Sequence, residues 1–196
     1  MTRVGSPLKS VQDILNAARA NPGKLNIATT APGSTQNLAA ELLRSVAGIN
    51  VAIVTFRTSG EMMTALLRGD VDFAFEFYAA ASGLIGPKQV IAVASTGPKR
   101  SVYLPDVPTV QESGVKDYEA LSWTGISVPA ATPQSVVQVL TKAINDVLPS
   151  PDVQERARKL GLDMRGSTPE EMTVRMKNDI AKWTAVIEKA GIQKLH

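Results

Sequence analysis

The stretch from Leu25 to Leu43, LNIATTAPGSTQNLAAELL, is the part of this sequence that decides the fold. A short apolar run enters a loop of small and hydroxylated residues, Thr29 to Thr35, and the loop leads into a helical spacing of apolar residues. A strand that turns into a helix in this way points backbone N–H groups, and the positive end of the helix dipole, at one spot. Such a spot suits an anion, so the stretch predicts a strand–loop–helix unit with a candidate anion site.

The segments on either side repeat the alternation of strands and helices. Strands are predicted at 25–28, 51–56, 71–77 and 90–95, and helices at 11–20, 34–47, 61–67 and 78–84. Ser10 is placed to cap the first helix, and Gly48 is placed to end the second. Because helices separate the strands, we expect a parallel α/β layer built from these four strands.

The second half of the chain has a mainly helical pattern. Helices are predicted at 134–148, 152–160 and 168–190, with Pro133 at a first helical position and Gly191 after the last helix. Two shorter elements are also predicted, a helix that starts at the capping pattern of Thr109 and Glu112 and a strand at 162–164.

The composition excludes several kinds of site. The chain has 196 residues, a formal net charge of +3 and no run of Lys or Arg, which argues against a nucleic-acid partner. It has no Cys and its single His is His196, which rules out disulfides, thiolate metal sites and histidine-based triads. There is no Walker-type loop, and no GxGxxG follows a predicted strand. We therefore expect a protein that is not an enzyme and that uses no cofactor and no metal.

Several segments, in order along the chain, resemble the substrate-binding proteins of tripartite tricarboxylate transporters, the TctC or Bug family. The matching segments include ANPGKL at 20–25, the loop and helix at 31–42, LRGDVD at 67–72 and SWTG at 122–125. The most specific match is KRS at 99–101 followed by LPDVPTV at 104–110. This ordered set covers nearly the whole chain.

The resemblance implies an α/β, periplasmic-binding-protein-like fold of two lobes around a cleft that holds a small carboxylate. This chain begins where the family is entering its second lobe, and the family's export signal and opening strands have no counterpart in it. We therefore expect one nearly complete α/β lobe at 1–120, which is the family's second lobe, a crossover or hinge at 121–132, and at 133–196 the mainly helical C-terminal part of the incomplete first lobe.

The function implied by the resemblance is solute binding, by a complete or truncated protein, for tripartite uptake of a small organic carboxylate with transporter membrane subunits as partners. One alternative is a non-transport homologue that acts as an oligomeric scaffold or as a cytoplasmic carboxylate sensor. A less favoured alternative is a carboxylate-processing enzyme. We expect a homo-oligomer, with exchanged helices, because the apolar stripes of the C-terminal helices would normally cover a sheet.

The expected location of the protein depends on whether an export signal belongs to it. No signal peptide is visible, and no apolar run is long enough to span a bilayer. The protein is therefore expected in the periplasm if a signal was removed, and in the cytoplasm if Met1 is the natural start.

The first group of candidate ligand-binding residues lies in the loop that opens this section. Ala31, Gly33, Ser34 and Thr35 form the group, in which the N–H groups of the last three would hold a carboxylate with help from the Ser and Thr hydroxyls. The alternative is an ordinary strand–helix loop whose Ser or Thr only caps the helix.

The other candidates follow the next two strands and the crossover. In TFRTSG, Thr58 and Ser59 would bind a second oxygen, and Arg57 would pair with a carboxylate or remain a solvated surface arginine. Glu76 would accept from a ligand ammonium or cap a nearby helix, because a buried carboxylate needs a partner. Trp123 would close over a ligand at the hinge, or pack in the core as most Trp residues do.

Overall fold

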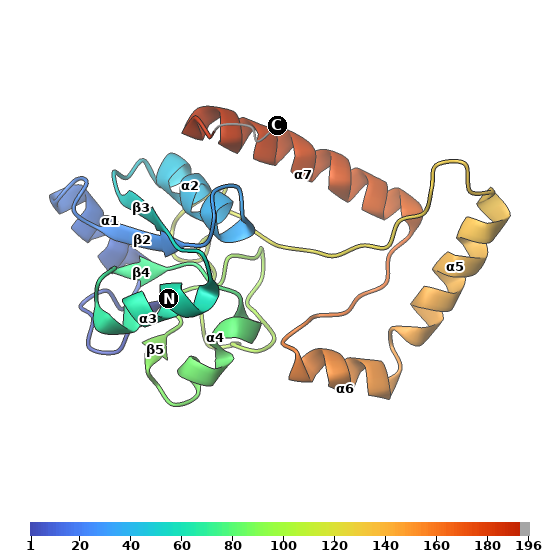
Figure 1. The fold of residues 1–196 in the computed structure, drawn as a ribbon, viewed down its shortest axis with the longest axis horizontal. Coiled ribbons are helices and arrows are strands. Elements are labelled where there is room, and N and C mark those ends of the chain that lie inside the picture. Colours follow the sequence, from blue (N-terminus) through green and yellow to red (C-terminus); the bar gives the residue numbers. More distant parts are fainter. Residues whose placement is uncertain (193–196) are drawn as a thin grey trace. The chain divides into compact units, whose positions relative to one another are not determined.

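The computed structural model describes residues 1–192, which fall into two compact units (Figure 1). Of the described residues, the first unit contains Met1–Ser122 and residues 185–192, and the second contains Trp123–Thr184. His196 lies outside the described residues.

A three-stranded parallel sheet organises the first unit. Its strands are β2 (Asn26–Thr29), β3 (Ala52–Thr55) and β4 (Phe73–Ala74), in the spatial order β3-β2-β4. Ile27 is paired with Ile53 on one side and with Phe73 on the other. Each strand is followed by a helix: α2 (Thr35–Ala47), α3 (Ser59–Arg68) or α4 (Tyr78–Ile85). The carboxyl ends of the three strands therefore meet at one edge.

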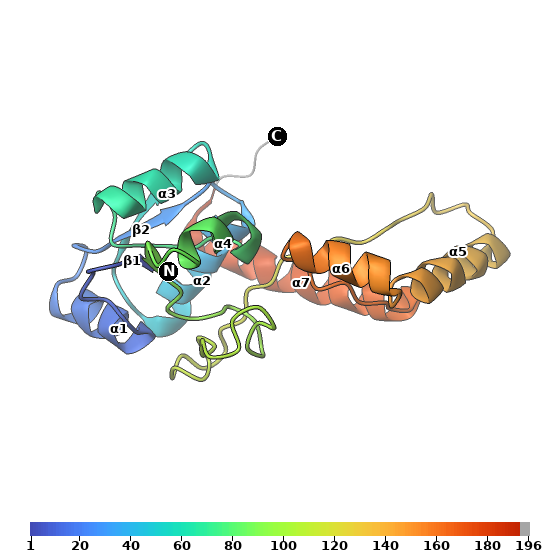
Figure 2. The same cartoon turned by 90° about the horizontal axis from the view of Figure 1, so that it is seen from below.

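Helices cover both faces of this sheet. Figure 2 shows α3 on one face, with α1 (Val11–Ala20) and α2 on the other. The chain crosses from β2 to β3 in one direction and from β3 over β2 to β4 in the opposite direction, so right-handed crossovers place α2 and α3 on opposite faces. Beneath α3, Met62 and Leu66 are fully buried against Ala28 and Ala74, and this packing holds the strand ends in place.

Side-chain caps define where the helices of the first unit begin. Ser10, Ser34 and Thr58 precede α1, α2 and α3, and each side chain accepts a hydrogen bond from a backbone N–H three residues later. The helix α2 ends at Gly48, whose φ of 60° lies in the left-handed region. The predicted Ser10 cap and Gly48 terminus are thus confirmed.

The prediction of four parallel strands is wrong for the fourth strand, which does not belong to the parallel sheet. The strand β5 (Val90–Ile91) is two residues long and pairs antiparallel with β1 (Thr2–Arg3), an element that the sequence pattern did not reveal. The N–H of Val4 continues this pairing by donating to the carbonyl of Gln89. An apolar run indicates a buried strand but carries no information on its partner, and the N-terminal residues supply that partner here.

Two short elements predicted from local patterns are absent from the described chain. The capping pattern at Thr109 and Glu112 is followed by turns rather than a helix, and residues 162–164 form no strand. The residues after Glu112 include Gly114, which has a φ of 96° that ends any helical path. Thr109 and Glu112 therefore make the contacts of a helix cap, but no helix follows them.

The second unit is helical and has very little core of its own. It contains α5 (Gln134–Val147), α6 (Pro151–Lys159) and most of α7 (Pro169–Ala190). Pro133 precedes α5 as its N-cap rather than occupying the first helical position. Ala157 is the one buried residue in Trp123–Thr184.

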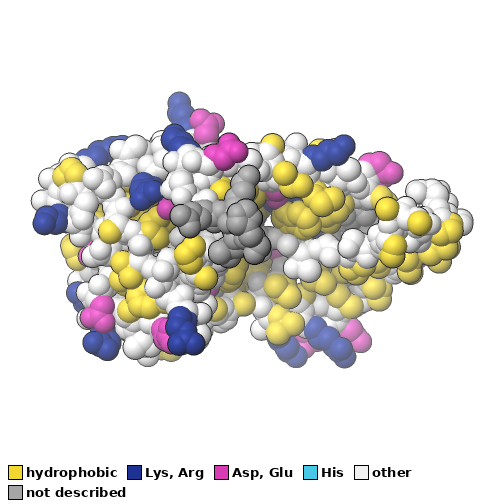
Figure 3. Space-filling view, turned by 45° about the horizontal axis from the view of Figure 1, so that its top comes forward, with side chains coloured by type: hydrophobic (Ala, Val, Ile, Leu, Met, Phe, Trp, Pro, Cys, Tyr) yellow, Lys and Arg dark blue, Asp and Glu magenta, His cyan; other side chains and the backbone are white. Residues whose placement is uncertain are grey.

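Large apolar side chains are correspondingly exposed on this unit, and Figure 3 shows many of them at the surface of its helices. They include Ile126, Val136, Val139, Leu160, Val174 and Ile180.

Two searches of the described residues were negative. None of the helices between residues 1 and 192 is long and apolar enough to cross a membrane. The same residues contain no cluster of three His, Asp or Glu side chains that could hold a metal ion.

Candidate functional site

Three loops converge at the carboxyl edge of the parallel sheet. They are residues 30–34 after β2, 56–58 after β3 and 75–77 after β4. Backbone hydrogen bonds hold the loops to the central strand, because the N–H of Phe56 donates to the carbonyl of Thr29 (2.9 Å) and that of Phe75 to the carbonyl of Ala28 (3.2 Å). This edge is where open α/β sheets commonly bind ligands.

The central loop is shaped by its own hydrogen bonds. Gly33 has a φ of 79°, which a residue with a side chain rarely adopts. Its N–H donates to Oδ1 of Asn37 (3.0 Å), and the N–H of Ser34 donates to the carbonyl of Ala31 (3.0 Å). Two of the three amides predicted to face a carboxylate are therefore already engaged within the loop.

The amides that remain available belong to the first turn of α2. Within residues 1–192, the N–H groups of Thr35 and Gln36 donate to no acceptor. These two groups lie at the positive end of the α2 dipole. Of the predicted Gly33–Thr35 amides, only that of Thr35 is therefore unengaged, together with that of the next residue, Gln36.

The hydroxyl groups of this loop form a small network. Oγ1 of Thr30 donates to Oγ of Ser34 (2.9 Å), and Ser34 in turn caps α2 by accepting from the N–H of Asn37 (3.2 Å). Buried Asn37 also donates to Oγ1 of Thr29 (3.5 Å). Sequence reasoning missed Asn37 and its neighbour Gln36, although two adjacent amide side chains in the first turn of a helix were a usable signal.

The loop after β3 contributes a positive charge and a helix cap. Thr58 accepts a hydrogen bond from the N–H of Glu61 (3.2 Å), so it caps α3, and Ser59 begins that helix. Arg57 is exposed and forms no ion pair with any described carboxylate. Its guanidinium group therefore has no competing partner in the described chain.

Glu76 links the loop after β4 to the start of α2. Its Oε1 accepts from Nε2 of Gln36 (3.0 Å) and from the N–H of Phe77 (2.8 Å). Its Oε2 is closed off from solvent and has no hydrogen-bond partner among the described residues. Glu76 is thus linked to the first turn of α2 through the Gln36 side chain, a contact that the sequence did not predict.

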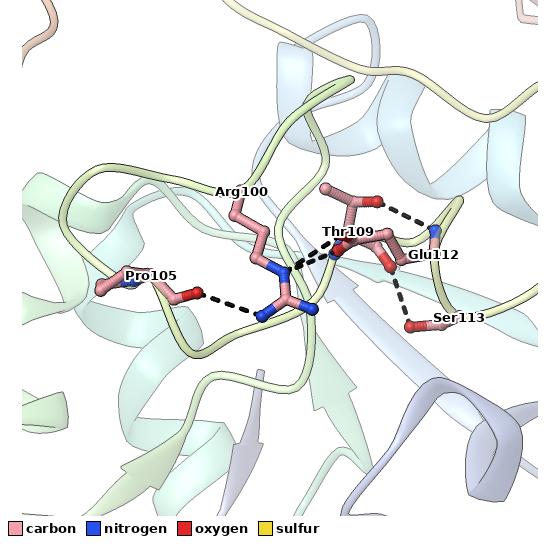
Figure 4. A network of polar contacts seen from close by, with 5 residues as sticks. All are labelled: Arg100, Pro105, Thr109, Glu112 and Ser113. Carbon is pink, nitrogen blue, oxygen red and sulfur yellow. Dashed lines mark hydrogen bonds and ion pairs between the residues drawn. The ribbon is translucent and has the colours of Figure 1, made fainter.

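The proline-rich segment after Gly97 packs beside this edge. The rings of Tyr78, at the start of α4, and Tyr103 are stacked with centroids 4.8 Å apart and an interplanar angle of 12°. Figure 4 shows how the segment closes on itself: Arg100 binds the carboxylate of Glu112 and the carbonyl of Pro105. These contacts shape the segment that carries the LPDVPTV motif.

Glu112 completes a capping box within that network. Its Oε2 accepts from the N–H of Thr109 (2.7 Å), and its own N–H donates to Oγ1 of Thr109 (3.0 Å). The hydrogen bond from Thr109 and the nearby Arg100 guanidinium hold the pKa of Glu112 below its usual range. Its role is structural.

Trp123 belongs to the second unit. There its Nε1 donates to Oδ2 of Asp179 on α7, and Arg175 contacts the same carboxylate oxygen. The indole is 40% exposed, so core packing does not account for its position.

The cavity in the first unit lies away from this edge. It has a volume of about 170 Å³ and lies at the amino ends of β2 and β4, lined by residues that include Arg3, Leu8, Leu25, Gly69, Val71 and Asp72. None of the predicted site residues lines it.

Comparison with known proteins identifies the family. The family described as "Tripartite tricarboxylate transporter family receptor" (TctC) matches residues 1–192. A UPF0065 protein from the tcbD-tcbE intergenic region of Pseudomonas sp. strain P51 is 34% identical over 183 residues, which are 93% of this chain and 54% of that protein. The chain therefore spans about half the length of this relative.

Solved structures agree with the sequence match. Rpa4515 of R. palustris with adipate is 30% identical, with a TM-score of 0.82, over 98% of this chain and 64% of that one. MatC (Rpa3494) of Rhodopseudomonas palustris with bound malate is 26% identical, with a TM-score of 0.74, over 95% and 64%. The fold is thus the α/β fold of periplasmic binding proteins, present in part, and the chain belongs to the tripartite tricarboxylate transporter receptor family.

Proposed function

We propose that this protein binds a small organic carboxylate at the carboxyl edge of its parallel sheet, as the receptor of a tripartite tricarboxylate-type uptake system. The observation that supports the proposal is the pair of unengaged amides, Thr35 and Gln36, at the positive end of α2. Two relatives whose solved structures contain adipate and malate support the class of ligand.

The proposed contacts divide between the loops. The N–H groups of Thr35 and Gln36 hold one carboxylate, and the hydroxyl groups of Ser34 and Thr35 assist. Arg57 receives a further carboxylate from the neighbouring loop, since its guanidinium can form two parallel hydrogen bonds with one carboxylate. Gly33 and Ala31 set the path of the loop, and Thr58 and Ser59 shape the start of α3.

Replacing Thr35 with Pro tests the amide contact directly. Proline suits the first position of a helix, and Ser34 before it has the extended backbone (φ −66°, ψ 160°) that a following proline requires. The substitution therefore removes one N–H while leaving α2 intact. Thr35→Ala is the matched control, because it removes the hydroxyl and keeps the N–H.

The measurement is a thermal-shift screen of dicarboxylates and tricarboxylates, followed by calorimetric titration. The wild type and Thr35→Ala should be stabilised by at least one acid, and Thr35→Pro should bind that acid about tenfold more weakly, as for one lost hydrogen bond to a charged group. Equal affinities in Thr35→Pro and Thr35→Ala would show that this amide is not a ligand contact. No stabilisation of the wild type by any acid at millimolar concentration would overturn the binding function.

We further propose a periplasmic location and docking to transporter membrane subunits, on the basis of family membership. A second candidate function is favoured by the exposed apolar helices of Trp123–Thr184. In that alternative the chain is a non-transport homologue, and its helical unit assembles with a second copy, with exchanged helices, into an oligomeric scaffold or carboxylate sensor.

A further inference from the structure

One face of α7 is covered within the second unit, although that unit has very little core. Met172, Arg175 and Asp179 are partly buried, and their spacing of three and four residues places them on the same face of the helix. Val174 and Ile180, which lie on other sides of α7, are 58% and 61% exposed. Another segment of the second unit therefore lies along the covered face.

The covering segment is the start of the crossover, residues 123–125, which form neither helix nor strand. Nε1 of Trp123 donates to Oδ2 of Asp179, and Nε of Arg175 donates to the same oxygen (3.2 Å). Both hydrogen bonds are charge-assisted, because the acceptor is a carboxylate. Trp123 is thus anchored on the covered face of α7.

The backbone of Gly125 approaches α7 too closely for an ordinary side chain. A Cβ atom built on Gly125 would lie 3.2 Å from Cε and 3.4 Å from Sδ of Met172, and 3.3 Å from Cζ3 of Trp123. The φ of Gly125 lies outside the left-handed region, so the constraint is one of space and not of backbone conformation. A glycine at this position therefore lets the crossover pack directly against Met172.

The two anchors join the segment by which the chain enters the second unit to the helix by which it leaves. The chain enters at Trp123 and leaves after Thr184, within α7. Just before the entry, Ala120 is buried and its N–H donates to the carbonyl of Thr96 (2.8 Å), and both of these residues belong to the first unit. Contact with α7 therefore begins as soon as the chain has entered the second unit.

We propose that residues 123–125 are a strap that locks α7 in place within the second unit. One anchor of the strap is the hydrogen bond from Trp123 to Asp179, and the other is the close packing of Gly125 on Met172. Because Ala157 is the one buried residue described in Trp123–Thr184, the strap supplies order that a core supplies in the first unit. When the strap detaches, α7 loses the cover of one face and opens together with the crossover. This inference is independent of carboxylate binding.

Hydrogen–deuterium exchange of the α7 amides tests the Trp123 anchor. Trp123→Phe keeps an aromatic ring and removes the indole N–H, so the amides of residues 173–182 should exchange about tenfold faster, as for one lost hydrogen bond to a charged group. Trp183→Phe is the matched control, because Nε1 of Trp183 donates to no acceptor among the described residues. The control should keep this exchange within about threefold of the wild type.

Two further substitutions test the Gly125 anchor and leave the hydrogen bond of Trp123 in place. Gly125→Val puts a branched side chain against Met172 and should lift the strap, so the α7 amides should exchange about tenfold faster. Met172→Ala makes room for the new side chain, so the double variant should exchange more slowly than Gly125→Val alone. Such a rescue identifies a direct contact, because independent losses of stability add.

The exchange of the first unit is measured in the same experiments and should not change in β2 and α3. The strap is wrong if Trp123→Phe leaves α7 exchange within about threefold of the wild type. An equal rise in β2, α3 and α7 would mean a general loss of stability and would also overturn it. So would additive effects of Gly125→Val and Met172→Ala, because the two residues would then act independently.

Discussion

At the scale of single residues, Glu112 shows how one side chain holds a loop that lacks regular structure. Its carboxylate binds the N–H of Thr109 and the guanidinium of Arg100, and Arg100 in turn binds the carbonyl of Pro105. The Arg100 contacts are exposed, so each contributes modestly, and they act together with backbone hydrogen bonds that join Ser95 to Pro108 and Val110. Arg100 and Glu112 each take part in two of these contacts, so the contacts form one connected network within the segment.

The lowered pKa of Glu112 predicts how stability changes in acid. A carboxyl group whose pKa is lower in the folded state stabilises the protein above its unfolded pKa, about 4.3 for glutamate, and this contribution is lost as the pH falls through the folded value. The wild type should therefore lose more stability than Glu112→Gln between about pH 5 and pH 3. Urea unfolding followed by circular dichroism across this range measures the difference.

Glu119→Gln is the control for this experiment, since Glu119 has no hydrogen bond or ion pair within the described residues. It should follow the wild-type pH profile. A Glu112→Gln profile parallel to that of the wild type would contradict the structural role assigned to Glu112.

At the scale of elements, Tyr118 attaches the segment after the proline-rich loop to α2. The side chain is fully buried, and its hydroxyl donates to the carbonyl of Ala39 in α2 (3.1 Å). Burial raises the pKa of Tyr118, so the hydroxyl remains a donor at alkaline pH. The α2 helix, whose first turn is the candidate anion site, is therefore anchored by a hydrogen bond from a residue far away in the sequence.

The hydrogen bond and the packing of Tyr118 can be measured separately. Tyr118→Phe removes only the hydroxyl and should lower the free energy of unfolding by about 1 kcal/mol. Tyr118→Ala also removes the buried ring and should lower it by about 3–5 kcal/mol. Chemical denaturation gives both values, and an unchanged stability in Tyr118→Phe would show that the hydrogen bond contributes nothing.

At the scale of the whole molecule, the two units differ in how much apolar surface they bury. The first unit encloses a sheet between helices, with residues such as Ile27, Met62 and Leu66 fully buried. In the second unit, Ala157 alone is buried among the described residues. Burial of apolar surface is the main source of folding free energy, so the second unit has little stability of its own.

We therefore predict that the second unit opens more readily than the first. In hydrogen–deuterium exchange, amides of α5 and α6 should exchange at least about 100-fold faster than those of β2 and α3, a difference of about 3 kcal/mol in opening free energy. Both tryptophans, Trp123 and Trp183, lie in the second unit, so their fluorescence should change at a lower urea concentration than the circular dichroism of the sheet unit.

Measurements at several protein concentrations show whether a second copy of the chain protects the helices of the second unit. If a second copy covers the apolar helices, protection of α5 should rise with concentration, and light scattering should give a mass above 20.8 kDa. Equal protection in the two units, at concentrations where the protein is monomeric, would contradict the prediction of a weak second unit.

The sequence predicted the local features of the fold well where the signal is itself local. Helices at 11–20 and 34–47 were predicted nearly to the residue, because Ser10, Ser34 and Gly48 act through neighbouring backbone groups. The strand and loop at Leu25–Thr35 were predicted for the same reason. Family membership was also readable from ordered motifs such as LPDVPTV.

Tertiary structure decided which groups meet and which are left unpaired. Only the fold shows that β5 pairs with β1 and that Gln36 reaches Glu76 across the sheet edge. The physical reason is one of range: caps and turns depend on residues within four positions of each other, whereas these contacts join segments as far apart as Thr2 and Ile91. The sequence by itself therefore determined the α/β fold and the place of the turn between β2 and α2, and the tertiary structure determined which donors and acceptors of that turn are free.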